Sequence, residues 1–202
     1  GDLLADRCAW KLDPAERRYL DLILDATGRM QSSIASLLEF ARTGHGPMAC
    51  EEVPLERLVA QVVADLAVPI RETGAAVRVD TLPVVHGNPG LLVRLFQNLL
   101  ANALKFHSDE PSEIRVSAER QGEHWLFSVK DNGIGIDATD HDRIFALIKR
   151  LHRRDAYPGA GIGLAVCKKV VECHRGQIWV ESERGRGADF RFTLPAGRGG
   201  RA

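Results

Sequence analysis

Two stretches of alternating polar and apolar residues constrain the fold most strongly, because each pattern predicts a β-hairpin. The first is SEIRVSAERQGEHWLFSVKDNG (residues 112–133), whose two runs flank Gln121, Gly122 and Glu123. The second is GQIWVESERGRGADFRFTLP (residues 176–195). Helical patterns precede both hairpins, without the regular strand–helix–strand alternation of a parallel sheet. The chain is therefore predicted to be an α+β protein, a two-layer α/β sandwich with a mixed sheet and helices on one face.

Residues 14–42 are predicted to form one long helix before this sandwich. Asp13 is its expected cap, with Pro14 in the first turn and Glu16 three residues after the cap. A heptad seam with one polar interruption then follows, made of Leu20, Ile23, Thr27, Met30, Ile34, Leu37 and Ala41. Such a narrow stripe favours a dimeric helical bundle over the alternative, an ordinary amphipathic helix packed on its own domain.

The sequence divides into three predicted parts. Residues 1–48 form a partial helical hairpin, in which LLADRCAWK (residues 3–11) is the end of a partner helix, and TGHGPM (residues 43–48) marks the boundary. Residues 49–195 form the sandwich, and residues 196–202 a disordered tail. Within the sandwich we expect a short strand at 50–55, helices at about 55–72, 88–107 and 163–174, and a strand at 75–82.

Composition excludes two classes of function. Lys+Arg and Asp+Glu are 27 each, so no excess positive charge is present to favour nucleic acid. The longest apolar runs carry charges and are too short to span a bilayer. The four cysteines lack paired C-x-x-C spacing, which predicts reduced thiols and a cytoplasmic setting, either of the whole protein or of the cytoplasmic part of a membrane-tethered sensor.

The glycine-rich stretch YPGAGIGLAVCKK (residues 157–169) indicates phosphate binding. It does not match the dinucleotide fingerprint, which needs a preceding strand and a third glycine three residues after the second, where Leu164 stands if the motif starts at Gly159. It does not match the P-loop either, because no Gly-Lys-Ser/Thr follows. Two other motifs accompany it. DNGIGID (residues 131–137) follows a predicted strand, and Asn98, Asn102 and Lys105 fall on one face of a predicted helix. Carboxamide oxygens suit Mg²⁺, and a lysine suits phosphate.

In this order along the chain, the three motifs resemble the catalytic, ATP-binding domain of sensor histidine kinases, a member of the Bergerat-fold superfamily that includes gyrase, MutL and heat-shock chaperone ATPases. The resemblance covers residues 50–195. The long helix resembles the second helix of the dimerisation and histidine-phosphotransfer domain. The sequence of residues 149–172, together with GQIWVES (residues 176–182), is most similar to kinase modules attached to phytochrome and PAS sensors.

This resemblance implies a site for ATP and Mg²⁺. Asp131 would accept a hydrogen bond from the adenine amino group, and Gly133 and Gly135 would let the backbone pack beside the base. Asn102, supported by Asn98, would hold Mg²⁺ against the phosphates. The other implied ligands flank these groups or close over the phosphates: Lys105, Phe106, Ile136, Phe145, Gly159, Gly161, Ile162, Gly163 and Leu164.

Residues 137–158 are implied to form a mobile lid, in which Arg150 matches an arginine that reaches the γ-phosphate. The implied catalytic set is therefore Asn98, Asn102, Lys105 and Arg150. Three residues depart from the family pattern: Ile148 stands where a second phenylalanine is usual, Ala160 where threonine is frequent, and Ala188 where serine or threonine is common. We expect these departures to affect lid geometry and rate more than ATP binding.

Asn98 also bears on the reaction. Gyrase-type ATPases and serine-phosphorylating relatives have a glutamate there as general base, and an amide cannot accept that proton. Asn98 therefore favours transfer to a neutral imidazole. No histidine lies on the predicted bundle helix, and His141 is interpreted as a surface residue of the lid. The acceptor is expected upstream of residue 1.

The sequence is thus interpreted as a homodimeric histidine kinase core that passes phosphate to a response-regulator receiver domain and follows a PAS or phytochrome-like sensor domain. Two alternatives stay open at this point. One is an ATP-binding pseudokinase or scaffold module, and the other is a stand-alone Bergerat-fold ATPase.

Overall fold

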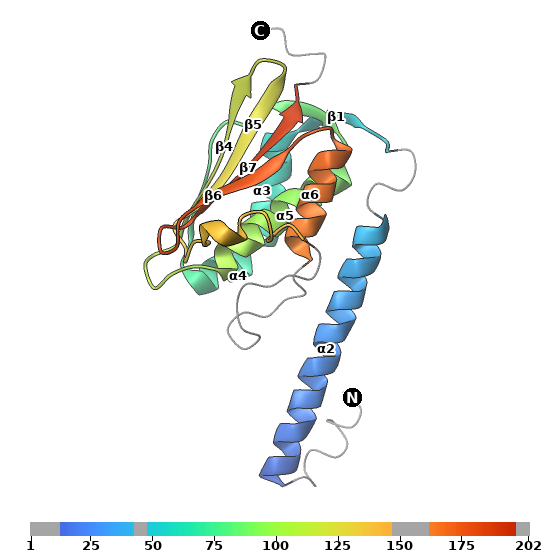
Figure 1. Ribbon diagram of the computed structural model, residues 1–202, viewed down its shortest axis with the longest axis vertical. Helices are drawn as coiled ribbons and strands as arrows, with labels where there is room; N and C mark the ends of the chain where they lie inside the picture. The colour runs from blue at the N-terminus through green and yellow to red at the C-terminus, as the bar shows by residue number, and fades with distance from the viewer. Residues whose placement is uncertain (1–12, 43–47, 147–161, 197–202) are drawn as a thin grey trace.

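The computed structural model describes residues 13–42, 48–146 and 162–196 (Figure 1). The predicted partner helix at 3–11, most of the boundary segment and of the lid, and all but the first residue of the predicted tail lie outside these ranges. The division into parts at residues 48 and 195 therefore stays a prediction.

A five-stranded mixed sheet forms one layer of the sandwich, as predicted. Its strand order is β2 (Ala76–Val79), β4 (Glu113–Gln121), β5 (His124–Asp131), β7 (Ala188–Pro195) and β6 (Ile178–Ser182). The β2–β4 pair is parallel and the other pairs are antiparallel. Both predicted hairpins are confirmed: β4 turns into β5 at Gly122, whose φ is +60°, and β6 returns as β7 with Ser182 opposite Ala188.

A second, two-stranded sheet pairs β1 (Glu51–Pro54) with β3 (Val84–Gly87). Strand β1 is as predicted from the sequence, whereas β3 was not predicted. The four residues of β3 are too few to show a reliable alternation. Their strand conformation depends on pairing with β1, which lies about thirty positions earlier in the chain.

Helices cover one face of the larger sheet, as Figure 1 shows. They are α3 (Leu55–Asp65), α4 (Ala67–Thr73), α5 (Pro89–Lys105) and α6 (Gly163–Cys173). The start of α5 is as predicted, because the Asn88 side chain caps the helix by accepting a hydrogen bond from the Leu91 amide at 3.0 Å. The fold-class prediction, a two-layer sandwich with helices on one face, is therefore confirmed.

The single helix predicted at 55–72 is wrong in one respect. The segment forms two helices, α3 and α4, with a break at Leu66. Pro69 explains the break, because it has no amide hydrogen to donate to the Asp65 carbonyl and its ring disfavours a continuous helix. The second helix then ends at Gly74, which has a φ of +65°.

Three phenylalanines join α5 to the centre of the sheet. Phe96 of α5 meets Phe127 of β5 and Phe192 of β7 edge-on, with ring centroids 6.3 and 5.7 Å apart, while Phe127 and Phe192 stack at 4.9 Å. All three side chains are fully buried. This contact fixes the face of α5 that points away from the sheet, and so the direction of its polar residues.

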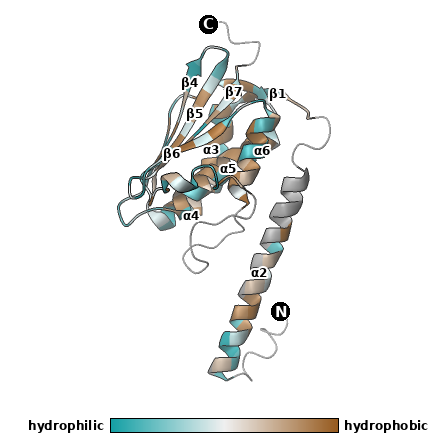
Figure 2. Ribbon diagram, viewed as in Figure 1, coloured by the Kyte–Doolittle hydropathy of each residue, from teal (hydrophilic) through white to brown (hydrophobic). Residues whose placement is uncertain are grey.

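The long helix α2 (Pro14–Arg42) has the predicted bounds and cap. Asp13 Oδ1 accepts from the Glu16 amide at 2.8 Å, and Glu16 Oε2 accepts from the Asp13 amide at 3.0 Å. Figure 2 shows apolar bands along α2, outside the two layers of the sandwich. Ile23, Met30 and Ile34 of the predicted seam are each more than half exposed. Among the described helices, none is both long and apolar enough to cross a membrane.

The cysteines that the structure describes, Cys50, Cys167 and Cys173, are free thiols, as expected. Cys8 lies outside the described residues.

His174 fastens the end of α6 to the start of α5. Its buried ring lies between two backbone groups: Nδ1 is 2.7 Å from the Val170 carbonyl oxygen, and Nε2 is 3.0 Å from the Asn88 amide. The carbonyl needs a donor and the amide needs an acceptor, so the ring is neutral with its proton on Nδ1. Burial lowers the pKa of His174, against the opposing effect of the hydrogen bond to Val170.

This arrangement predicts an acid-sensitive fold. Because the pKa of His174 is lowered by folding, its contribution to stability is complete above the ordinary histidine pKa of about 6.5 and is lost as the pH falls toward the folded value. His174→Phe leaves the Asn88 amide without its acceptor and should lower the free energy of unfolding at pH 8 by about 1–3 kcal/mol. It should also flatten the pH dependence of urea unfolding. The exposed His124, changed to Phe, is the control, and an unchanged pH profile in His174→Phe would contradict the prediction.

Candidate functional site

Asp131, the last residue of β5, lies buried at the centre of the site. Its Oδ1 accepts hydrogen bonds from the amides of Gly133 at 2.9 Å and Ala188 at 3.2 Å. Both bonds end on Oδ1, so Oδ2 can accept a donor from a ligand. Burial raises the pKa of Asp131 from its ordinary value, while the two backbone hydrogen bonds act in the opposite direction.

The loop after Asp131 needs glycine at two positions. A Cβ on Gly133 would lie 2.2 Å from the Phe106 carbonyl oxygen, which also accepts from the Ile134 amide at 3.0 Å. Gly135 has a φ of +66°, and a Cβ there would lie 2.1 Å from the Glu183 carbonyl oxygen. The loop therefore packs by its backbone against the end of α5 on one side and against the β6–β7 connection on the other.

The predicted polar face of α5 adjoins this loop. Asn98, Asn102 and Lys105 are all half-buried and follow one another at i, i+4 and i+7. Asn98 reaches the start of α6, since its Oδ1 would lie 2.8 Å from a Cβ on Gly163. At the other end, Lys105 Nζ lies 4.7 Å from the Phe106 ring centroid. The structure thus brings together the α5 motif, the loop after β5 and the start of α6, which are distant in sequence.

The start of α6 favours a negative ligand. Ile162 precedes the helix and makes no side-chain capping hydrogen bond, and no acidic residue occupies the first turn. The first-turn amides and the helix dipole at such an end attract phosphate. Ile162 is buried and Leu164 half-buried. Among the described residues, no cluster of three or more His, Cys, Asp or Glu could hold a metal. Carboxamide oxygens, such as those of Asn98 and Asn102, are of the kind that suits Mg²⁺.

Only the first part of the lid lies in the described residues. Phe145 is buried and meets Phe190 edge-on, with ring centroids 6.5 Å apart. His141 is half-buried, and its Nε2 lies 3.4 Å from the Ile136 carbonyl oxygen. Three predicted site residues, Arg150, Gly159 and Gly161, and two of the departures, Ile148 and Ala160, lie outside the described residues.

Two residues of the site were missed by the sequence reading. Gly187 has a φ of +77°, and a Cβ there would lie 2.0 Å from the Asp131 carbonyl oxygen. Ser182 Oγ accepts from the Ile136 amide at 2.8 Å. The GRGA run (residues 185–188) is a signal for Gly187, but residues 176–195 were interpreted only as a β-hairpin. Ala188 contributes its backbone amide to Asp131, so its departure from the family pattern leaves that contact intact.

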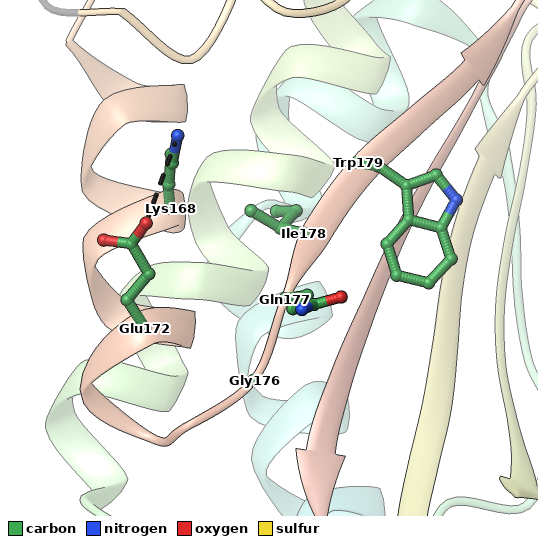
Figure 3. A pocket seen from close by; sticks show the side chains of 6 residues that line it. All are labelled: Lys168, Glu172, Gly176, Gln177, Ile178 and Trp179. Carbon is green, nitrogen blue, oxygen red and sulfur yellow. Dashed lines mark ion pairs between the residues drawn. The ribbon is translucent and has the colours of Figure 1, made fainter.

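An open pocket of about 400 Å³ lies at the far end of β6 from Ser182 (Figure 3). Its walls come from α6 and the start of β6: Lys168, Glu172, Gly176, Gln177, Ile178 and Trp179. Lys168 and Glu172 form an ion pair at 4.0 Å across one wall. None of these residues belongs to the predicted site, so the pocket is separate from it.

Comparison with known proteins gives a family match over residues 87–198, to the model described as "Histidine kinase-, DNA gyrase B-, and HSP90-like ATPase". This range covers more than half of the chain and contains all three motifs.

Named relatives are longer than this chain. Cyanobacterial phytochrome A of Nostoc sp. is 44% identical over 195 residues, which cover 96% of this chain and 26% of the phytochrome. Adaptive-response sensory kinase SasA of Synechococcus sp. is 36% identical over 195 residues, covering 93% of this chain and 51% of the kinase. The chain therefore spans about a quarter to a half of the length of these relatives.

Solved structures share the fold. Full-length ShkA in complex with AMPPNP superposes with a TM-score of 0.72 at 27% identity, covering 96% of this chain and 41% of ShkA. Histidine kinase ThkA in complex with the response regulator TrrA gives a TM-score of 0.71 at 21% identity, covering 95% of this chain and 55% of ThkA. At 21% identity, the similarity to ThkA concerns the fold alone.

Gly135, in the loop after Asp131, and Gly122, in the turn of the first hairpin, both have a positive φ. Together they give a matched test of the site. Gly122 has open space around its Cβ position, whereas Gly135 faces the Glu183 carbonyl. Gly122→Ala should therefore lower the free energy of unfolding by about 1–2 kcal/mol, from backbone strain alone. Gly135→Ala adds the steric clash and should cost about 2–5 kcal/mol. Urea unfolding of both variants measures the difference, and equal losses would show that the loop moves aside without resistance.

Proposed function

Since this chain belongs to the family of histidine kinase-, DNA gyrase B- and HSP90-like ATPases, and its relatives include phytochromes and sensor kinases, we propose that it is the ATP-binding core of a protein histidine kinase in a two-component system. The observation that carries the proposal is the buried Asp131 carboxylate, which presents Oδ2 beside a loop that only glycine can form. The polar face of α5 and the start of α6 lie next to it.

Asp131 is the proposed adenine selector. Its Oδ2 accepts a hydrogen bond from the exocyclic amine of adenine, and guanine has a carbonyl oxygen at that position, which offers no hydrogen. The backbone at Gly133 and Gly135 carries no side chain that would hold the base away. Phe106 and Ile136 flank the same loop and supply apolar contact to the base or ribose.

The polar face of α5 is the proposed phosphate and Mg²⁺ site. Asn102 and Asn98 supply carboxamide oxygens to the ion, which neutralises charge between the phosphates when it is bound. Lys105 contacts a phosphate oxygen, and the α6 amides after Ile162 face the triphosphate. From the family resemblance, Arg150, Gly159 and Gly161 complete this part of the site, with Arg150 directed at the γ-phosphate.

The proposed reaction is phosphoryl transfer to a histidine. A nitrogen lone pair of a neutral imidazole attacks the γ-phosphorus, the bond from that phosphorus to the bridging β–γ oxygen breaks, and ADP leaves with the electron pair. The site's residues position the triphosphate and stabilise its charge. Asn98 has no lone pair basic enough to take a proton from water, and this disfavours hydrolysis.

The exposed apolar side chains of helix α2 support the proposal of a dimer. The exposed side chains of Ile23, Met30 and Ile34 on α2 are a costly arrangement for an isolated helix and suit a bundle shared by two copies. We propose that the acceptor histidine lies on a helix upstream of this chain. A response-regulator receiver domain is the proposed next acceptor, in line with the complex of ThkA with TrrA, and a phytochrome- or PAS-type domain is the proposed sensor.

Asp131→Asn tests ATP binding with little change of shape. The amide oxygen can keep the two hydrogen bonds from Gly133 and Ala188, and this puts the NH₂ group where Oδ2 stood. Two donors then face each other, so the Kd for ATP with Mg²⁺ should rise about 10–100-fold by calorimetry. Asp109→Asn, at an exposed site, is the control. Unchanged affinity in Asp131→Asn would refute the proposed adenine contact.

Phosphohistidine formation tests the kinase proposal. The chain extended by its native upstream helix should incorporate acid-labile, alkali-stable label from [γ-³²P]ATP, and the same extended chain with Asp131→Asn should not. ATP binding without phosphohistidine would instead support the pseudokinase alternative. Rapid ATP hydrolysis by the unextended chain would support the stand-alone ATPase.

A further inference from the structure

The connection between β6 and β7, together with the first residue of β7, contacts the loop of residues 131–136 at several points. The Gly185 amide donates to the Ile134 carbonyl at 2.8 Å, and the Ala188 amide donates to Asp131 Oδ1 at 3.2 Å. The Cα of Gly187 packs on the backbone of Asp131 so closely that no side chain fits between them. The geometry of the loop therefore depends on where this connection sits.

Ser182 bridges the two segments with one hydroxyl. Its Oγ accepts from the Ile136 amide at 2.8 Å and donates to the Gly187 carbonyl at 2.6 Å. Within the described residues, it is the one side-chain hydroxyl recorded between the 131–136 loop and the β6–β7 connection. Ser182 is half-buried, so water does not freely replace either bond.

We propose that Ser182 is a positioning residue for adenine recognition, which acts by holding Gly187 and Ile136 so that Asp131 keeps its orientation. This inference rests on the proposed ATP site. With the Gly187 carbonyl fixed by Ser182, the next amide, that of Ala188, points at Asp131 Oδ1 and leaves Oδ2 for the base. The bond to Ile136 holds the other end of the same loop.

The proposal separates base recognition from phosphate binding. Ser182 has no recorded contact with Asn98, Asn102 or the start of α6, and its hydrogen bonds both go to the base-binding side of the site. Its loss should therefore weaken the contact with the adenine amino group much more than the contacts with the phosphates.

The affinities for two nucleotides would test this separation of base recognition from phosphate binding. Calorimetry with Mg²⁺ would compare ATP with purine riboside triphosphate, which lacks the 6-amino group, on the 202-residue chain. Ser182→Ala should raise the Kd for ATP about 5–10-fold, equivalent to the loss of a hydrogen bond near 1 kcal/mol, and change that for the analogue less than about 2-fold. Ser182→Thr keeps the hydroxyl and should restore ATP binding to within about 2-fold. Ser117→Ala, on the face of the sheet away from the helices, is the matched control.

Each outcome bears on the assignment. Equal weakening of both nucleotides by Ser182→Ala, unchanged ATP affinity, or failure of threonine to restore it would overturn the positioning role. If Ser182→Ala does not fold, as judged by circular dichroism, Ser182→Cys keeps the shape with a poor hydrogen-bonding group and takes its place. If the unsubstituted chain binds both nucleotides equally, the proposed adenine contact of Asp131 fails first, and the role of Ser182 fails with it.

Discussion

The packing of α5 on the sheet determines most of this structure. Phe96 packs edge-on against Phe127 and Phe192 of the two central strands, and the apolar side of the helix is buried with it. Because a helix turns one face inward and the other outward, this single contact directs Asn98, Asn102 and Lys105 toward the start of α6 and the loop after β5.

Close contacts between backbone segments form the candidate site. Gly133, Gly135 and Gly187 let three chain segments approach more closely than any side chain would allow. Asp131 is buried among them, and its hydrogen bonds come from amides that cannot change rotamer. A carboxylate held in this way keeps its orientation before any ligand arrives, so little ordering is left for binding to supply.

Local chemistry explains which features could be predicted from the sequence. The ends of α2, the cap of α5, both hairpins and the glycines of the 131–136 loop depend on residues within a few positions of one another. The break at Leu66 follows from Pro69, a local signal that was overlooked. The pairing of β3, the bridge through Ser182 and the contacts of His174 join residues that are far apart in the chain, and no local pattern specifies them.

The position of the His174 ring also restricts which residues can replace Gly87. A Cβ on Gly87 would lie 2.9 Å from the His174 ring and 2.9 Å from Leu92, so strand β3, helix α5 and the end of α6 meet there with no spare room. A side chain at this end of β3 would therefore need both the imidazole and the Leu92 side chain to give way. The three positions form one steric unit, and a change at Gly87 is expected to require changes at the other two.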